Sequence, residues 1–240
     1  MKVVPLHSWP QGRQDGVRLQ LDLAPRVIRK GRPSGVRLVA GVDISAPDKE
    51  GKARAAAVVL SYPELEMVEL KVVRERLPFP YIPGLLAFRE LPLILAALER
   101  LEKEPQLLLA DGQGLAHPRR FGIACHLGLW LERPVIGCAK SLLLGNHGPL
   151  GEAQGSWAEL WDRGEVVGAA VRTRQGVTPV YVSTGHLIGL EAAIEWVLHL
   201  TRHHRLPEPL RLAHLAASGE LKEKEEELGR LPYLARRVHG

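Results

Sequence analysis

Hydrophobic and polar residues alternate in three successive segments of the first third of the chain, a pattern typical of β-strands. The segments are Val36–Ile44, Ala53–Leu60 and Glu66–Arg76, and short polar stretches separate them. Because strands joined by short connections pair as antiparallel neighbours, the pattern predicts a three-stranded antiparallel meander.

In the next part of the chain, segments in which apolar residues recur at helical spacing alternate with short, continuously apolar segments that are typical of buried strands. The predicted elements are a helix over Leu85–Glu104 with a kink at Pro92, a strand over Leu107–Ala110, a helix over Phe121–Leu131 and a strand over Val135–Ala139. A strand, a helix and a second strand form a right-handed parallel unit, and an apolar strand is typically buried on both faces.

The remaining pattern predicts a glycine-rich loop, a hairpin and two late helices. These are the loop Gly145–Gly155, strands over Glu165–Thr173 and Pro179–Ser183, a helix over Gly189–Arg202 and a helix that carries His214. The strand order resembles the ribonuclease-H-like α/β fold, in which a mixed sheet of three antiparallel strands followed by parallel strands is flanked by helices.

We expect residues 1–240 to form a single domain with two appendages. One is an N-terminal helical extension at about residues 9–30, and the other is a charged C-terminal tail at about residues 219–240. The charge run over 220–227 is expected to be a solvated helix face or a loose tail.

Composition narrows the class of protein only slightly. The formal net charge of +5 permits a nucleic-acid partner without requiring one. Cys125 and Cys138 match no metal or redox spacing, so a reducing, cytoplasmic location is expected. No apolar run approaches the roughly 20 residues of a membrane span, and we expect no membrane partner.

The stretch from Leu107 to Arg120 combines residue types that suit phosphate chemistry. Asp111 ends an apolar strand, where open α/β sheets bind ligands, and glycines, His117, Arg119 and Arg120 follow. Glycines allow close approach of backbone N–H groups, and arginines match phosphate geometry. A carboxylate beside phosphate-binding arginines is favourable if a divalent cation lies between them. The alternative is a buried strand followed by an ordinary loop with solvated arginines.

A second aspartate, Asp43, lies on the first predicted strand. In a ribonuclease-H-like sheet the first and fourth strands are neighbours, so Asp43 and Asp111 are expected to meet. Two facing carboxylates repel each other unless one is protonated or a cation such as Mg²⁺ joins them. Asp43 could otherwise be a turn former at the end of its strand.

Three further polar residues are candidates for the same chemistry. Glu90 could be a third acidic ligand or a base, although an acidic residue on an amphipathic helix is usually solvated. His214 could be a ligand or a structural histidine. Lys140, directly after a buried strand, could meet a phosphate or a developing oxyanion.

Tyr81 has a rigid setting, because Pro80 and Pro83 flank it closely. A stiff aromatic side chain beside a nucleic-acid groove can wedge between bases and support base extrusion. The alternative is a tyrosine that fills the edge of the core.

Several of these motifs together resemble the endonuclease V family of deoxyinosine-directed nucleases. The resemblance runs in order from about residue 36 to about residue 215. It rests on Gly41–Asp43, Pro80–Glu90, Asp111–Arg120, Gly122–Ala124, Ile136–Lys140, Thr184–His186 and Pro207–Pro209. The block around Tyr81 and the block that begins at Asp111 are the most specific.

The resemblance implies a ribonuclease-H-like fold, Mg²⁺ or Mn²⁺ as cofactor, and a nick at the second phosphodiester bond 3′ to deoxyinosine in the repair of deaminated adenine. It implies metal ligation by Asp43 and Asp111, with Glu90, Lys140 and His214 as further catalytic residues. Contacts with the substrate are expected from Tyr81 as a wedge, from a base pocket built from backbone around Leu86, Gly112, Gly122 and Gly137, and from His117 and Arg119. Arg119 and Arg120 are expected to contact backbone phosphate, and the alternative for them is a surface salt bridge.

Two other functions stay open at the level of sequence. One is a ribonuclease-H-like nuclease that acts on inosine-containing RNA or on flap or branched DNA. The other is a nucleic-acid-binding module without catalysis, which the presence of Asp43, Glu90 and Asp111 disfavours. DNA that contains deoxyinosine, double- or single-stranded, is the expected partner, and a monomer the expected state. The number of metal ions is left open.

Overall fold

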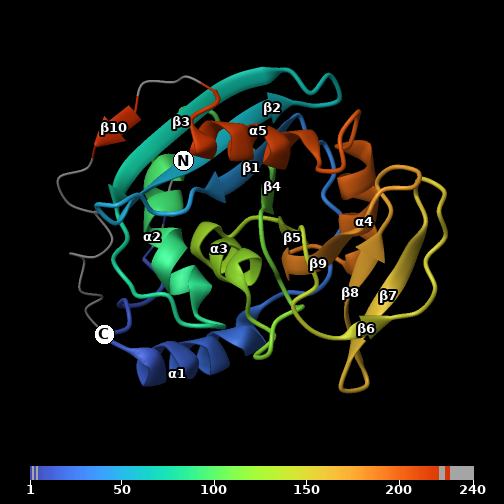
Figure 1. Cartoon of the computed structure of the whole chain (residues 1–240), viewed down its shortest axis with the longest axis horizontal. Helices are drawn as coiled ribbons and strands as arrows, with labels where there is room; N and C mark the ends of the chain where they lie inside the picture. Colours follow the sequence, from blue (N-terminus) through green and yellow to red (C-terminus); the bar gives the residue numbers. More distant parts are fainter. Residues whose placement is uncertain (2, 4, 222–224, 228–240) are drawn as a thin grey trace.

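The computed structural model describes residues 1, 3, 5–221 and 225–227. Its strands are β1 (Leu38–Ile44), β2 (Lys52–Ser61), β3 (Met67–Arg76), β4 (Leu107–Ala110), β5 (Val135–Ala139), β6 (Asn146–His147), β7 (Trp157–Asp162), β8 (Glu165–Val171), β9 (Val180–His186) and β10 (Glu225–Glu227). In this described part they form one sheet, in the order β10-β3-β2-β1-β4-β5-β9-β8-β7-β6 (Figure 1).

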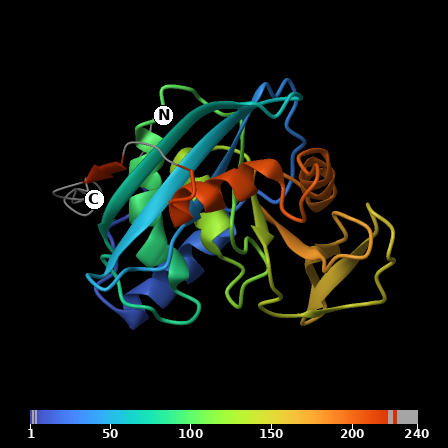
Figure 2. The same ribbon diagram turned by 45° about the horizontal axis from the view of Figure 1, so that its top comes forward.

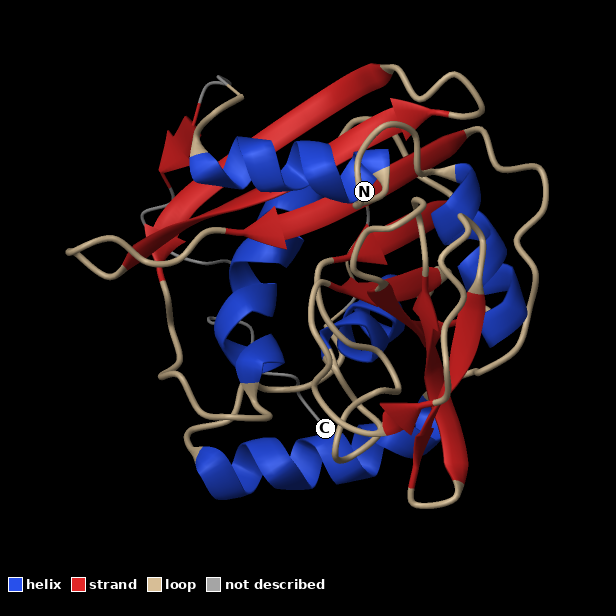
Figure 3. Ribbon diagram, turned by 45° about the vertical axis from the view of Figure 1, so that its right-hand side comes forward, coloured by secondary structure: helices blue, strands red, loops and turns tan. Residues whose placement is uncertain are grey.

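Helices cover both faces of the sheet and give three layers (Figures 2 and 3). The helices are α1 (Arg13–Leu23), α2 (Leu86–Glu99), α3 (Ile123–Leu131), α4 (Leu190–His199) and α5 (Glu208–Ser218). Apolar side chains of α2 and α3 form one core with the sheet, and those of α4 and α5 form a second core on the opposite face. Burial of these two apolar surfaces is the main force that holds the layers together.

The strand pairing confirms the predicted fold class. β1, β2 and β3 form an antiparallel meander, and β4, α3 and β5 form a parallel unit. β1 also pairs with β4 in parallel, and the register aligns Val42 with Ala110. The next residue in β1 is Asp43, and the residue directly after β4 is Asp111, so this register brings the two carboxylates to the same edge of the sheet.

The structure differs from the prediction in three elements. The loop predicted over Gly145–Gly155 contains the short strand β6, and strand β7, which follows that loop, was not predicted. The helix predicted to reach Glu104 ends at Glu99. The apolar spacing continues beyond that end because Leu101 packs into the core without being helical. The spacing of apolar residues indicates which residues are buried, so a buried residue that follows a helix makes the predicted helix too long.

The prediction of a solvated helix face or loose tail over 220–227 is wrong at Glu225–Glu227. The backbone of these residues forms β10 and pairs in parallel with Val72–Arg74 of β3. Strand pairing uses backbone N–H and C=O groups, so a run of charged side chains does not reveal it. The rest of the predicted tail, at 222–224 and 228–240, lies outside the described residues. Within the described residues, no helix is long and apolar enough to cross a membrane.

The segment before α1 is anchored through two buried histidines. His7 Nε2 lies 2.6 Å from His126 Nε2 of α3, and the rings of Trp9, Trp130 and Phe88 pack around them. His7 Nδ1 lies 2.9 Å from the Ser8 carbonyl, which assigns the Nδ1 proton to His7. His126 therefore donates from Nε2 to His7, and both rings are neutral. Burial lowers the pKa of His7, and it lowers the pKa of His126 well below its usual value.

These histidines predict a loss of stability in mild acid. Below a pH of about 6.5 the unfolded chain takes up protons at His7 and His126 that the folded chain does not, so unfolding becomes easier. We expect the free energy of unfolding to fall as the pH drops from 6.5 to 5, by up to ~1.4 kcal/mol per pH unit for each histidine.

Urea unfolding at several pH values measures this slope. His126→Asn and His7→Asn should each reduce it, because asparagine does not titrate. His204→Asn is the matched control at an exposed histidine and should leave the slope unchanged. A slope that is the same in wild type and in both buried-site variants would contradict the assignment.

Candidate active site

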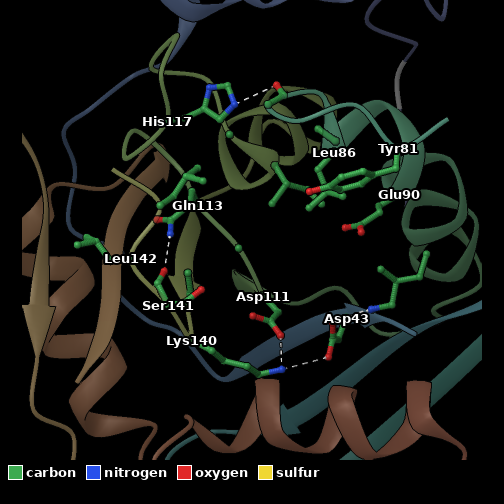
Figure 4. Close-up of a pocket in the computed structure, with 18 of the residues that line it drawn as sticks. Asp43, Tyr81, Leu86, Glu90, Asp111, Gln113, His117, Lys140, Ser141 and Leu142 are labelled. Atoms are coloured by element: carbon green, nitrogen blue, oxygen red, sulfur yellow. Dashed lines mark hydrogen bonds and ion pairs between the residues drawn. The ribbon is translucent and has the colours of Figure 1, made fainter. Parts of the chain in front are cut away.

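The candidate site is a pocket of about 420 Å³ at the carboxyl ends of β1, β4 and β5 (Figure 4). Asp43 of β1 and Asp111, directly after β4, contribute carboxylates, and Glu90 of α2 lines the same pocket. The loop that carries Tyr81 and the glycine-rich loop after β4 form further parts of the lining. The pocket therefore lies where open α/β sheets bind their ligands.

The two aspartates and His214 form a compact group. His214 Nδ1 lies 2.8 Å from Asp43 Oδ2, and one potential ligand atom from each of Asp43, Asp111 and His214 lies within 4.8 Å of the others. His214 reaches this position from α5, which crosses directly over Gly41 of β1. The helix can approach the strand so closely because residue 41 has no side chain.

Lys140 completes the group from the end of β5. Its Nζ atom lies 2.5 Å from Asp111 Oδ2, 3.9 Å from Asp43 Oδ2 and 3.4 Å from His214 Nδ1. Figure 4 shows the lysine side chain reaching between the two aspartates. Residues separated by up to 171 positions therefore meet at one point.

Burial, and after it the proximity of other carboxylates, governs the electrostatics of the site. Burial and the nearby Asp111 carboxylate raise the pKa of Asp43, although His214 and Lys140 oppose the shift. Burial, Asp43 and Asp111 raise the pKa of Glu90 to about 8. Three carboxyl groups in one pocket favour a protonated form of one of them unless additional positive charge is bound.

A divalent metal ion fits these residues. Carboxylate oxygens are the ligands that Mg²⁺ prefers, at about 2.1 Å, and Asp43 and Asp111 offer them from two rigid neighbouring strands. Manganese also accepts carboxylate oxygens, and His214 lies in the same group of potential ligand atoms. The shortage of positive charge beside three acidic groups is the observation that supports such an ion.

The glycines after β4 serve either an unusual backbone angle or close packing. Gly112 has a φ of +147°, and a Cβ atom on Gly122 would lie 2.1 Å from the carbonyl oxygen of Gln113. Gly112 and Gly122 line the pocket. Gly137 lies behind this loop, where a Cβ atom would meet the Gly114 nitrogen at 2.5 Å, and it is not among the residues of the lining.

Tyr81 and Leu86 stand at the rim of the pocket. The Tyr81 side chain is 66% exposed, and Leu86 is 38% exposed. Of the two possibilities for Tyr81, an exposed ring and a ring that fills the edge of the core, the structure shows the exposed ring.

His117, Arg119 and Arg120 all have protein partners in the structure. His117 Nε2 and Arg119 Nη2 both lie near the Gly84 carbonyl, at 3.1 and 2.6 Å. Arg120 pairs with Asp162 and Glu165 at 2.8 and 2.7 Å. Burial lowers the pKa of His117 to about 4. Phosphate contact by Arg119 stays a prediction, and His117 lines the pocket as a neutral ring.

Several pocket residues were missed by sequence reasoning. They are Gln20 on α1, Gln113 after β4, and Ser141, Leu142 and Leu143 after β5. Gln113 lies between the glycines of a recognised motif and could have been found from it. Gln20 carries no comparable signal, because it reaches the pocket only through the packing of α1.

The ribonuclease-H-like sheet with a carboxylate pair, a histidine and a lysine at its ligand-binding edge defines the class: an α/β nuclease with a candidate metal centre. The family model of endonuclease V matches residues 21–215. This chain belongs to the endonuclease V family and is an endonuclease.

Individual relatives agree with this assignment. Endonuclease V of Gloeobacter violaceus is 56% identical over 212 residues, which cover 87% of this chain and 86% of the relative. The crystal structure of endonuclease V from Streptomyces avermitilis has a TM-score of 0.84 and 42% identity, and the match covers 88% of this chain and 94% of that one. Ciona intestinalis endonuclease V, in complex with a 24mer DNA that contains an inosine followed by a ribo-adenosine, has a TM-score of 0.74, 31% identity and coverages of 85% and 95%.

Proposed function

We propose that this protein nicks DNA at the second phosphodiester bond 3′ to deoxyinosine, with 5′-phosphate and 3′-hydroxyl ends, in the repair of deaminated adenine. The observation that carries the proposal is the group of Asp43, Asp111, His214 and Lys140 beside a glycine-walled pocket with an exposed aromatic residue at its rim. The Ciona relative in complex with inosine-containing DNA supports this choice of substrate.

Asp43 and Asp111 would hold Mg²⁺, or Mn²⁺ in its place, and His214 and Glu90 would complete or orient the ligand set. Such an ion activates water and neutralises charge on the scissile phosphate. Lys140 Nζ, held by Asp111, would stabilise the negative charge that develops on the phosphate oxygens.

Recognition would depend on the pocket and on Tyr81. Hypoxanthine offers O6 as an acceptor and N1–H as a donor, and it lacks the 2-amino group of guanine. Backbone N–H groups around Gly112 would hold O6, and a close wall would exclude the amino group. Tyr81 would occupy the gap left by the extruded base, and a poorly paired deaminated base costs less to extrude.

Mapping the cut on a labelled duplex with a single deoxyinosine tests the proposal. We expect one nick, at the second bond 3′ to the inosine, with a 5′-phosphate that ligase accepts and a 3′-hydroxyl that polymerase extends. A chelator should abolish the nick, because it removes the ion that activates water and neutralises charge. Added Mg²⁺ or Mn²⁺ should restore the nick.

Matched substrates give the controls for this mapping. The duplex with guanosine at the same position should stay intact, and the corresponding RNA strand measures the preference between DNA and RNA. Equal cutting of the guanosine duplex, or a cut at another bond, would contradict the proposal. Faster cutting of the RNA strand would favour the ribonucleic-acid alternative.

A further inference from the structure

The carbonyl oxygen of Gly84 is the meeting point of three side chains from separate parts of the chain. Gln20 Nε2 lies 3.0 Å from it, Arg119 Nη2 lies 2.6 Å from it, and His117 Nε2 lies 3.1 Å from it. Gly84 ends the proline-rich loop that carries Tyr81, and its φ of +78° suits glycine. Three side-chain contacts therefore hold the end of this loop through one backbone atom.

His117 takes part in this cluster as a neutral donor. The Arg119 backbone N–H donates to His117 Nδ1 at 3.3 Å, so the ring proton is assigned to Nε2, which faces the Gly84 carbonyl. Arg119 contributes a permanently charged donor. Both side chains come from the glycine-rich loop after β4, which forms the opposite part of the pocket lining.

Gln20 joins this cluster from α1 and uses both ends of its amide. Its Nε2 group donates to the carbonyls of Gly84 and Phe121, at 3.0 and 3.2 Å, and its Oε1 atom accepts from Arg119 Nε at 2.5 Å. The side chain is 1% exposed and lines the pocket. Phe121 directly precedes Gly122, the residue before α3. Gln20 therefore links the Tyr81 loop to the side of the pocket lined by Gly112 and Gly122, which we call the glycine wall.

The buried Gln20 amide, with both its nitrogen and its oxygen hydrogen-bonded, constrains the relative position of its three partners. A buried side chain that hydrogen-bonds two carbonyls and a guanidinium has one favourable position. Its loss removes one of the three donors to the Gly84 carbonyl, the side-chain donor to the Phe121 carbonyl and the acceptor of Arg119 Nε. α1 lies largely ahead of the stretch matched by the family model, which begins at residue 21.

We propose that Gln20 is a positioning residue that sets the separation between the Tyr81 loop and the glycine wall, and thereby the selectivity of the pocket for hypoxanthine over guanine. The inference on selectivity rests on the proposed function. A wall that moves outward leaves more room for the 2-amino group that a close wall excludes. Tyr81, attached to the same loop, would lose its fixed position over the base step.

Gln20→Met tests this inference, because methionine keeps the length and fills the space but makes no hydrogen bond to the three partners. Gln14→Met is the matched control, since Gln14 lies on the same helix with an exposed side chain. For Gln20→Met we expect kcat/KM on deoxyinosine DNA to fall about 10- to 100-fold. We also expect the ratio of deoxyinosine to deoxyguanosine cutting to fall, whereas Gln14→Met should match wild type.

Deuterium uptake gives a readout that needs no substrate. Gln20→Met should exchange faster than wild type in residues 80–88 and 112–123 and equally elsewhere, and Gln14→Met should not. Unchanged uptake in both segments would overturn the positioning role. Faster uptake with an unchanged cutting ratio would overturn the role in selectivity. If the wild type does not cut deoxyinosine DNA at all, the proposed function fails, and the uptake measurement still decides the positioning role.

Discussion

Asparagine in place of Asp111 is expected to lower the rate of nicking at deoxyinosine by about three orders of magnitude, which corresponds to ~4 kcal/mol of transition-state stabilisation. Asp111 faces Asp43 from the neighbouring strand and holds Lys140 Nζ at 2.5 Å. The substitution removes one proposed metal ligand and the partner of the lysine at once. Asp43→Asn should have an effect of similar size.

The same variants should fold at least as well as the wild type when a chelator is present. Asp43, Glu90 and Asp111 crowd three carboxyl groups into one pocket, and the pKa values of Asp43 and Glu90 are raised by this environment. Removal of one charge relieves the repulsion, so the melting temperature should stay the same or rise. Lower activity with equal or higher stability distinguishes a functional carboxylate from a structural one.

Asp15→Asn is the matched control, because it makes the same chemical change at an exposed position of α1. Single-turnover nicking, DNA binding without metal and thermal unfolding would be measured for all three variants. Binding should change by only a few-fold. Wild-type nicking by Asp111→Asn would show that the carboxylate pair is not the catalytic centre.

Alanine in place of Gly41 is expected to destabilise the fold by about 3 kcal/mol, the upper part of the range for overpacking a core. A Cβ atom at this position would lie 2.1 Å from the Pro209 carbonyl oxygen and 2.8 Å from the Leu210 nitrogen. These are backbone atoms at the start of α5 and cannot rotate away. The helix must therefore move off β1 as a unit.

This displacement should also reduce activity, because His214 is carried by the same helix and contacts Asp43 at 2.8 Å. Urea unfolding and nicking at a temperature well below the transition measure the two effects separately. Gly148→Ala is the matched control, because a Cβ atom there meets nothing within 4 Å. An unfolding free energy for Gly41→Ala equal to that of the control would contradict the close packing of α5 on β1.

Much of the central architecture could be predicted from the sequence because its pattern is local. Alternating residues predicted β1 to β3, apolar runs predicted β4 and β5, and the parallel pairing of β1 with β4 then placed Asp43 beside Asp111. The prolines around Tyr81 left two interpretations open, a presented ring and a ring that fills the edge of the core, and the structure exposes the ring. These features depend on near neighbours in the chain and on rules of strand order.

Other features were decided by packing between distant segments. β10 joins the sheet through backbone pairing that its acidic side chains do not reveal. Arg119 and Arg120, predicted as phosphate contacts, have partners supplied by Gln20, Asp162 and Glu165. No local period predicts such contacts, because each partner is chosen by the relative position of two elements.

The amino-acid sequence by itself therefore determined the fold class, the order of the central strands and the two aspartates of the candidate centre. Only the tertiary structure decided that Lys140 reaches between those aspartates, that His214 arrives over Gly41, and that Gln20 joins both sides of the pocket. The physical reason is separation in the sequence, because Gln20 and Arg119 are 99 positions apart and meet only through the packing of α1 against the rest of the fold.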